Sequence, residues 1–308
     1  MQTARLRIGT RGSPLALVQA GIVRTCLARA RGVEEDAFEV VPIRTTGDRI
    51  TDRPLAEVGG KGMFSKEIDI ALVEGHVDLA VHSAKDLETH MPPGIAIAAC
   101  LEREDVRDAF LSSVAGTLGD LPSGATVGTA SLRRAALVRH ARPDLTVVPM
   151  RGNVQTRLAK LGGGEADATL LALAGLNRLG LADRATCLIE TDGWLPAAGQ
   201  GVVAVTVREG DAKTAETVAI IDHGPTSTAL NCERAYLAAL DGSCHTPIGG
   251  HARIAGADVD FNGIILKVDG SDPHTIARRG PFADAVAIGR EAGEVLRAAG
   301  GPGYFDEG

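Results

Sequence analysis

The sequence predicts an α/β protein with two doubly wound α/β lobes and a small α+β domain at its C-terminal end. Two observations lead to this fold class: a β-α-β-α-β order near the N-terminus that begins again at Ala125, and a different order after His223. Alternating strands and helices favour a parallel sheet with helices on both faces. We expect the first lobe at residues 1–102 and 200–220, the second at 103–199 and the third domain at 221–308.

The first lobe begins with a short strand at residues 6–9. Ser13 and Pro14 then start a helix, because serine caps free N–H groups and proline suits the first helical position. Gly32 ends this helix, since glycine readily adopts the left-handed conformation that follows many helices. A strand at 38–46, a helix at 65–74 and a strand at 78–82 complete the lobe, and we expect its strands to be parallel.

The second lobe repeats the same start. A strand from Ala125 leads to Gly128, and Ser131 caps a helix that extends to about Arg142. A strand at 145–150 and a helix from about Asn153 follow. The segment 196–201 interrupts this block, and we expect the apolar strand at 202–207 to return to the first sheet.

A different order marks the third domain. We expect a helix at 226–240, a loop that contains Cys244, strands at 252–254 and 259–268, and a final helix at 282–299. Glycines and a proline surround Cys244, so the sequence predicts an exposed loop there rather than a buried helix or strand. A thiol in such a loop is open to chemical attachment.

The composition limits the classes of partner. The chain has 308 residues, 44% of them hydrophobic, and a net charge of −7, so it lacks the basic surface that nucleic acids and anionic membranes require. No apolar run is long enough for a membrane span, and residues 1–5 lead into a strand without a signal-peptide core, which predicts a cytoplasmic protein. The acidic surface favours a monomer. Five cysteines without Cys-x-x-Cys or Cys/His spacing predict neither a disulfide framework nor a metal site.

Arginines near strand ends and helix starts predict a site for anions. Arg11 precedes the first helix, and Arg133 and Arg134 fall in the first turn of another helix, where positive charge disfavours the helix itself. Arg151 follows a strand, and Arg157 lies on the helix after it. Because the arginine fork fits carboxylates and phosphates, we expect a small ligand with several negative charges in a cleft between the two lobes.

A second group of polar residues lies at the end of the strand at 78–82. His82, Ser83, Lys85 and Asp86 come where an apolar run ends. The carboxyl ends of strands are where α/β proteins gather their functional groups, so we expect this strand end to take part in chemistry. The alternative is that Asp86 only caps the next turn.

Seven strings of residues resemble those of the porphobilinogen deaminase family. They are GTRGSPLAL at 9–17, GGKGMFSKE at 59–67, VHSAKD at 81–86, VGTASLRR at 127–134, RGNVQTRL at 151–158, AGQG at 198–201 and DGSCHTPIG at 241–249. The strings follow the family's order, and the match extends from residue 5 to the last helix. Seven matches in order are far more specific than any one of them.

The resemblance implies an enzyme, a transferase of tetrapyrrole (haem or chlorophyll type) biosynthesis. Members of the family join four molecules of porphobilinogen head to tail, release ammonia at each addition and hydrolyse the product, hydroxymethylbilane, from the enzyme. Their cofactor is a dipyrromethane, which is made from the same substrate and held by a thioether to a loop cysteine that matches Cys244. Asp86 matches the catalytic aspartate of the family, and Lys85 stands beside it.

The resemblance also assigns the residues that bind the cofactor and the growing chain. Each pyrrole carries an acetate and a propionate, so the site needs several arginines. The assigned positions are Cys244, Arg11, Ser13, Ser83, Lys85, Asp86, Thr129, Ser131, Arg133, Arg134, Arg151, Gly152, Arg157 and Gln200. Lys61 and Phe64 match a glycine-rich segment that acts as a lid in the family, and Arg178 is a further carboxylate contact from a shorter match.

Two departures from the family's pattern affect loops. Asp241-Gly242-Ser243 stands where a Gly-Gly pair often precedes the cysteine, and Glu88 replaces a frequent proline after the catalytic aspartate. Two other classes of protein share part of the pattern. A non-catalytic two-lobed anion-binding protein has a similar β-α-β repeat but no use for Cys244, whereas a cysteine-nucleophile transferase or hydrolase needs a histidine base and an orienting carboxylate near the thiol.

Overall fold

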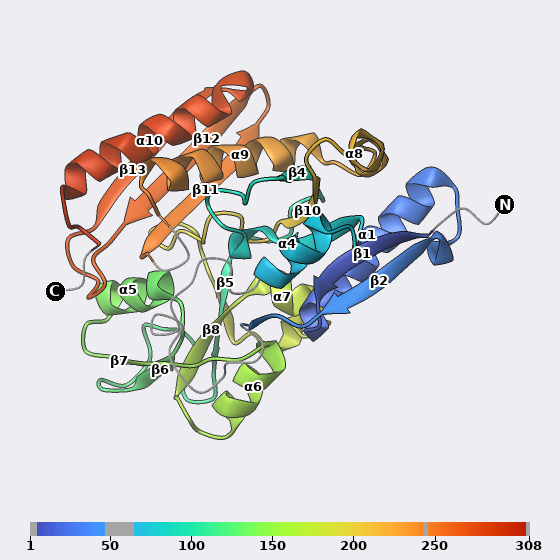
Figure 1. Cartoon of the computed structure of the whole chain (residues 1–308). Coiled ribbons are helices and arrows are strands. Elements are labelled where there is room, and N and C mark those ends of the chain that lie inside the picture. The colour runs from blue at the N-terminus through green and yellow to red at the C-terminus, as the bar shows by residue number, and fades with distance from the viewer. Residues whose placement is uncertain (1–4, 47–64, 243–245, 306–308) are drawn as a thin grey trace. The chain divides into compact units, whose positions relative to one another are not determined.

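The computed structural model describes residues 5–46, 65–242 and 246–305 (Figure 1). In these residues the strands form three sheets, and the chain divides into two compact units. Unit 1 contains residues 1–104 and 201–227, and unit 2 contains residues 105–200 and 228–308. The first sheet lies in unit 1, and the other two lie in unit 2.

The sheet of unit 1 is mixed. Its strands are β1 (Leu6–Arg11), β2 (Phe38–Ile43), β3 (Leu79–Ser83), β4 (Ile95–Cys100) and β10 (Val203–Arg208), in the spatial order β2-β1-β3-β10-β4. β1 runs parallel to β2 and β3, as predicted, whereas β10 runs antiparallel to β3 and β4. The carboxyl ends of β1 and β3 therefore meet at one edge of the sheet, where ligand sites of α/β folds form.

Helices cover both faces of this sheet. They are α1 (Pro14–Arg31), α4 (Lys66–Val73) and α8 (Ala212–Ala219), with short 3-10 helices η1 (Glu35–Ala37) and η2 (Ala84–Asp86). Val81 of β3 packs in the same cluster as Val23 of α1 and Val218 of α8, whereas its neighbour Ala80 packs with Ile68 of α4. Because successive strand residues point to opposite faces, α1 and α8 lie on one face and α4 on the other.

The first sheet of unit 2 is also covered on both faces. Its strands are β5 (Asp108–Ser112), β6 (Thr126–Gly128), β7 (Thr146–Val148), β8 (Ala168–Ala172) and β9 (Cys187–Ile189), in the order β7-β6-β8-β5-β9. The helices of this part are α5 (Leu132–Ala141), α6 (Val154–Gly162), α7 (Leu173–Arg178) and the 3-10 helix η3 (Ala182–Arg184). Leu170 packs with Leu137 of α5, and the next residue, Leu171, packs with Leu158 of α6. This alternation is the doubly wound arrangement that the sequence predicts.

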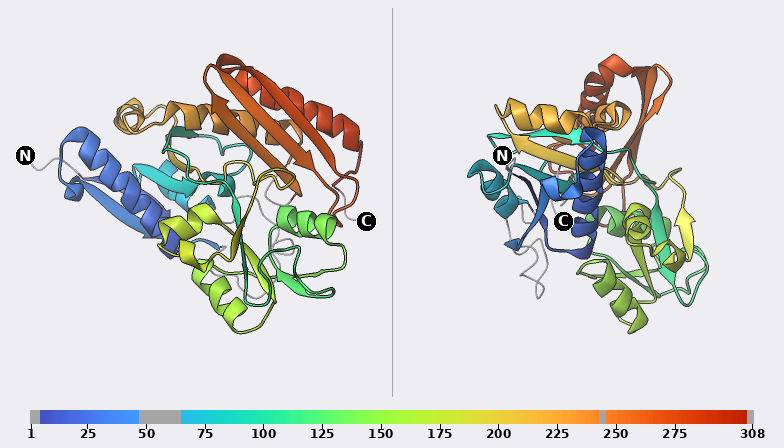
Figure 2. Two further views of the ribbon diagram at one scale, coloured as in Figure 1. Left: turned by 180° about the vertical axis from the view of Figure 1, so that it is seen from behind. Right: turned by 90° about the vertical axis from the view of Figure 1, so that its right-hand side faces the viewer.

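The remaining elements of unit 2 form a three-stranded antiparallel sheet with two helices on one face (Figure 2). They are α9 (Gly224–Ala239), β11 (Ile248–Ala255), β12 (Asp258–Ile265), β13 (His274–Pro281), the 3-10 helix η4 (Phe282–Asp284) and α10 (Ala285–Gly300). The first turn of α9, up to Ser227, belongs to unit 1. Tyr236 of α9 is fully buried, and its ring centroid lies 4.8 Å from that of Phe261 on β12. The predicted α+β character of this part is confirmed.

The sequence located most elements but missed several. The return of residues 202–207 to the first sheet is confirmed by the pairing of β10 with β3. β4, β5, β8, β9, β13, α7 and α8 were not predicted. β13 was missed because Ile276 is its one buried residue, so the strand lacks the alternation that marks a half-buried strand.

No helix in the described part of the chain is long and apolar enough to cross a bilayer. The three-domain boundaries stay a prediction.

The crossing of α9 and α10 depends on a glycine. A Cβ atom on Gly289 of α10 would lie 2.0 Å from the backbone carbonyl oxygen of Cys232 in α9. We expect Gly289→Ala to lower the free energy of unfolding by about 2 kcal/mol or more, because the helices would have to separate. The measurement is urea unfolding followed by circular dichroism.

Gly21 provides the matched control for this substitution. It lies inside α1, and a Cβ atom there would meet no heavy atom within 4 Å. Gly21→Ala should therefore raise stability by up to about 1 kcal/mol, because alanine is the better helix former. Equal effects of the two substitutions would show that the helix crossing does not require Gly289.

Candidate active site

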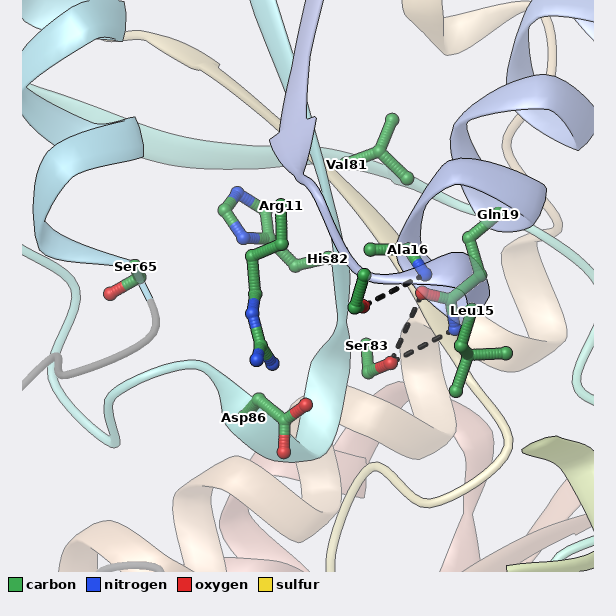
Figure 3. Close-up of a pocket in the computed structure, with 10 residues that line it drawn as sticks. Arg11, Leu15, Ala16, Gln19, Ser65, Val81, His82, Ser83 and Asp86 are labelled. Carbon is green, nitrogen blue, oxygen red and sulfur yellow. Dashed lines mark hydrogen bonds between the residues drawn. The ribbon is translucent and has the colours of Figure 1, made fainter. Parts of the chain in front are cut away.

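A pocket in unit 1 gathers several of the predicted site residues (Figure 3). Arg11 comes from the end of β1, Ser13 from the start of α1, and Ser83 and Asp86 from the end of β3 and the η2 turn. The pocket has a free volume of about 50 Å³. This space suits a single small polar group such as a carboxylate arm, because each water-sized group needs about 10 to 15 Å³.

Local hydrogen bonds explain why β1 and α1 present these residues. The Ser13 hydroxyl accepts from the backbone N–H of Ala16 at 3.3 Å, which caps α1 as the sequence predicts. The buried hydroxyl of Thr10 lies 3.3 Å from the carbonyl oxygens of Ala16 and Val81, so it joins the first turn of α1 to β3. The two strand ends and the helix start are thereby held together.

Ser83 faces a buried amide. The side-chain nitrogen of Gln19 donates to the Ser83 hydroxyl oxygen at 2.9 Å, and that oxygen lies 3.2 Å from Oε1 of Gln19. Gln19 is 2% exposed, and sequence reasoning did not select it. Its apolar neighbours on α1 concealed it, because a single polar residue on a buried helix face gives no periodic signal. The predicted contact of Ser83 with a cofactor stays a prediction.

Asp86 is exposed at the pocket, and the side chain of Arg11 extends toward it (Figure 3). Lys85 occupies the same turn and is half-buried. A carboxylate with a guanidinium group extending toward it suits a ligand that carries both negative groups and a developing positive charge.

His82 and Asp69 are buried titratable groups near this site. Nε2 of His82 lies 3.1 Å from the hydroxyl oxygen of Thr206, and burial lowers the pKa of His82 to about 4. Burial raises the pKa of Asp69, on α4, to about 6. The imidazole is therefore neutral at pH 7, and it adds no positive charge beside Asp86.

In unit 2 the predicted residues cluster at the start of α5. The Ser131 hydroxyl accepts from the backbone N–H of Arg134 at 3.4 Å and caps the helix. The backbone N–H of Ser131 in turn donates to the hydroxyl of Thr129 at 3.2 Å. Both hydroxyls thus shape the turn from which Arg133 and Arg134 project.

Arg133 and Arg134 are buried and bind an acidic residue of their own unit. Nη2 of Arg133 donates to Oδ2 of Asp108 at 2.8 Å, and Nη2 of Arg134 donates to Oδ1 at 2.6 Å. Burial opposes ionisation of Asp108, but the two guanidinium charges outweigh it and hold the pKa of this carboxyl well below its usual value. Sequence reasoning missed Asp108, although an acidic residue that opens an apolar strand is a recognisable signal.

The other predicted residues of unit 2 that the structure describes lie around α6, at the end of α7 and at position 200. Nε of Arg157 donates to the carbonyl oxygen of Gly152 at 2.9 Å, and Arg151 is half-buried. Gly152 has a φ of +116°, and a Cβ atom there would lie 2.6 Å from Thr156, so this turn requires glycine. Arg178 ends α7, and Gln200 is fully buried. Cys244, Lys61 and Phe64 lie outside the described residues.

Two protein-family models match the chain. The model described as "Porphobilinogen deaminase, dipyromethane cofactor binding domain" covers residues 6–216. The model described as "Porphobilinogen deaminase, C-terminal domain" covers residues 227–298. The two matches together account for most of the sequence.

Curated relatives agree with these matches. Porphobilinogen deaminases of Nitrobacter winogradskyi and Nitrobacter hamburgensis are each 55% identical over 298 residues, which covers 97% of this chain and 94% of the relative. Similar solved structures include a periplasmic substrate-binding protein of an ABC transporter from Coxiella burnetii, with 15% identity, coverage of 70% and 91%, and a TM-score of 0.43. The methionine-binding protein MetQ has 12% identity, coverage of 77% and 94%, and a TM-score of 0.45.

His82 and Asp69 should change the stability of the protein in opposite directions as the pH falls. The unfolded chain protonates His82 near pH 6.5 and the folded chain only near pH 4, so the stability contributed by His82 is lost as the pH falls through this range. Folded Asp69 takes up its proton near pH 6 and the unfolded carboxyl near 3.8, so stability is gained as the pH falls. Between pH 6.5 and 4 the wild-type protein should lose about 3 kcal/mol of its free energy of unfolding through His82, and His82→Gln should not show this loss. In Asp69→Asn the free energy of unfolding should fall more steeply with falling pH than in the wild type.

Urea unfolding at several pH values between 4 and 7 measures these slopes. His76→Gln is the matched control, because the His76 side chain is 71% exposed in the same unit. Parallel pH profiles for the wild type and both variants would contradict the assigned shifts.

Proposed function

This chain belongs to the porphobilinogen deaminase family, and on that premise we propose that it condenses four molecules of porphobilinogen head to tail into hydroxymethylbilane. The observation that carries the proposal is the pair of family matches at residues 6–216 and 227–298, together with 55% identity over nearly the full length of named porphobilinogen deaminases. The reaction makes the chain a transferase that releases ammonia at each addition. The cytoplasmic location and the monomeric state stay predictions.

The described residues of unit 2 fit a dipyrromethane with carboxylate arms. The Nε atoms of Arg133 and Arg134 are buried and have no hydrogen-bond partner in the described part of the chain, which favours an anionic group beside them. When bound, dipyrromethane supplies the free pyrrole carbon to which the first substrate unit is added. Thr129, Ser131, Arg151 and Arg157 are the further residues that we assign to its carboxylates and to those of the growing chain.

Cys244 is the residue that we assign to the thioether. The four described cysteines support this choice because none is exposed. Burial raises the pKa of Cys232 to about 12, and burial also raises the pKa of Cys187. Since the thiolate is the reactive form of cysteine, these two are poor nucleophiles at pH 7.

Asp86 is the carboxylate that we assign to the chemical step. The aminomethyl group reacts in its protonated, ammonium form: when its C–N bond breaks, the electron pair leaves with ammonia and the positive charge passes to the pyrrole. Asp86 stabilises this charge and afterwards accepts the proton that is lost when the new bond has formed and the ring regains aromaticity. Arg11 and Ser13 orient the substrate through its carboxylates, and Lys85 adds positive charge for the same purpose.

We expect Cys244→Ser to abolish cofactor attachment, because the serine hydroxyl is not ionised at pH 7 and cannot replace the thiolate. Intact-protein mass spectrometry should show the unmodified mass for Cys244→Ser and a dipyrrole adduct for the wild type. Cys187→Ser is the control and should keep the adduct. A dipyrrole found by peptide mapping on any other cysteine would overturn the assignment.

We expect Asp86→Asn to fold normally and to lower kcat by at least about 100-fold, since a preorganised charge that stabilises a cationic transition state supplies about 3 kcal/mol or more. Ammonia release from porphobilinogen, measured with cofactor-loaded protein, gives the rate. Glu216→Gln changes an exposed carboxylate on α8 of the same unit and should leave kcat unchanged. Near-normal turnover of Asp86→Asn would assign the step to another carboxylate.

A further inference from the structure

Asp108 is the centre of a buried cluster in unit 2. Besides the two arginines, Nε1 of Trp194 donates to its Oδ2 at 3.0 Å, and the side-chain nitrogen of Gln200 donates to its Oδ1 at 2.8 Å. Each carboxylate oxygen therefore accepts one charged and one neutral hydrogen bond. The Asp108 side chain has no exposed surface, so these four donors replace water completely.

A second anchor fixes each guanidinium group. Nη1 of Arg133 donates to the carbonyl oxygen of Leu195 at 2.7 Å, and Nη1 of Arg134 donates to that of Leu170 at 3.0 Å. With Nη2 bound to Asp108, each planar group is held at two points and cannot rotate. The Nε–H of each arginine is buried and has no acceptor among the described residues.

The charges of the cluster do not cancel. Two guanidinium groups and one carboxylate leave one positive charge among side chains that are 4% and 5% exposed at Arg133 and Arg134. Buried charge is costly unless it is paired, and a buried donor without an acceptor adds to that cost. Both observations indicate a singly charged anion as the missing component.

We propose that Asp108 is a positioning residue, which aligns Arg133 and Arg134 so that together they hold one carboxylate of the dipyrromethane cofactor. Trp194 and Gln200 act one step further away, because they fix the carboxylate that fixes the arginines. This inference rests on the proposed function for the identity of the anion. The position of Asp108 is itself rigid, since its backbone pairs with Ala172 of β8 and Ile189 of β9.

Asp108→Glu and Trp194→Phe separate positioning from charge balance. Asp108→Glu keeps the negative charge but moves it by one methylene group, and Trp194→Phe keeps an aromatic ring but removes the indole N–H. We expect both variants to incorporate cofactor about tenfold more slowly than the wild type, which corresponds to the loss of about one net hydrogen bond. Asp144→Glu is the control, because Asp144 forms an exposed pair with Arg142 in the same unit.

Cofactor incorporation is followed by intact-protein mass spectrometry after porphobilinogen is added to cofactor-free protein. Circular dichroism and urea unfolding are measured on the same samples before the addition. A variant that is folded but slow to load supports the proposal. Wild-type loading by a folded Asp108→Glu variant would overturn it, since charge alone would then suffice. If Asp108→Glu does not fold, Trp194→Phe decides, and its wild-type loading would overturn the proposal.

The single tryptophan supplies a second readout that does not depend on catalysis. Trp194 contacts Asp108 directly, so its fluorescence should change when the cofactor enters the wild-type protein, and the change should be absent from Asp108→Glu samples that remain unloaded. If adding porphobilinogen changed the Trp194 fluorescence of Asp108→Glu protein without a dipyrrole mass as much as it changed that of the wild type, the proposal would be contradicted. A wild-type protein that never acquires a dipyrrole mass would instead contradict the proposed function.

Discussion

The arrangement of unit 2 depends on one buried ion cluster, in which Asp108 accepts from two arginines. Its members come from the start of β5, the first turn of α5 and the segment that follows residue 193. Breaking a buried charge pair leaves an uncompensated charge, which costs far more than the loss of a surface pair. The cluster therefore fixes where α5 begins relative to the sheet, and the hydroxyls of Thr129 and Ser131 follow from that placement.

The buried polar residues at the pocket of unit 1 are neutral, in contrast to the buried ion cluster of unit 2. Gln19 and Ser83 satisfy each other, and His82 is neutral and bound to Thr206. The charged side chains that line the pocket are Arg11 and Asp86, and Arg11 extends toward Asp86. Such a pocket suits a reaction in which positive charge appears only transiently, because a carboxylate stabilises a developing cation while an arginine binds the carboxylates of the substrate.

Local signals in the sequence were sufficient for much of the fold. The serine caps at Ser13 and Ser131 act between neighbouring residues, so they are visible in the sequence and are confirmed by the structure. The partners of Asp108 could not be predicted in this way, because they lie 25, 26, 86 and 92 residues away. That the two arginines at the start of α5 disfavour the helix stays a prediction, and their buried protein partner depends on the tertiary structure.

The place of β10 in the first sheet also constrains how the chain is made. β10 lies between β3 and β4, so in the finished sheet β4 is joined to the other strands only through β10. All strands of the first sheet of unit 2 are encoded between β4 and β10. During synthesis on the ribosome, the second sheet is thus complete in sequence before the first can close. Domains generally fold as units while the chain emerges. The sheet of unit 1, whose first strand is made first, is therefore completed after the first sheet of unit 2.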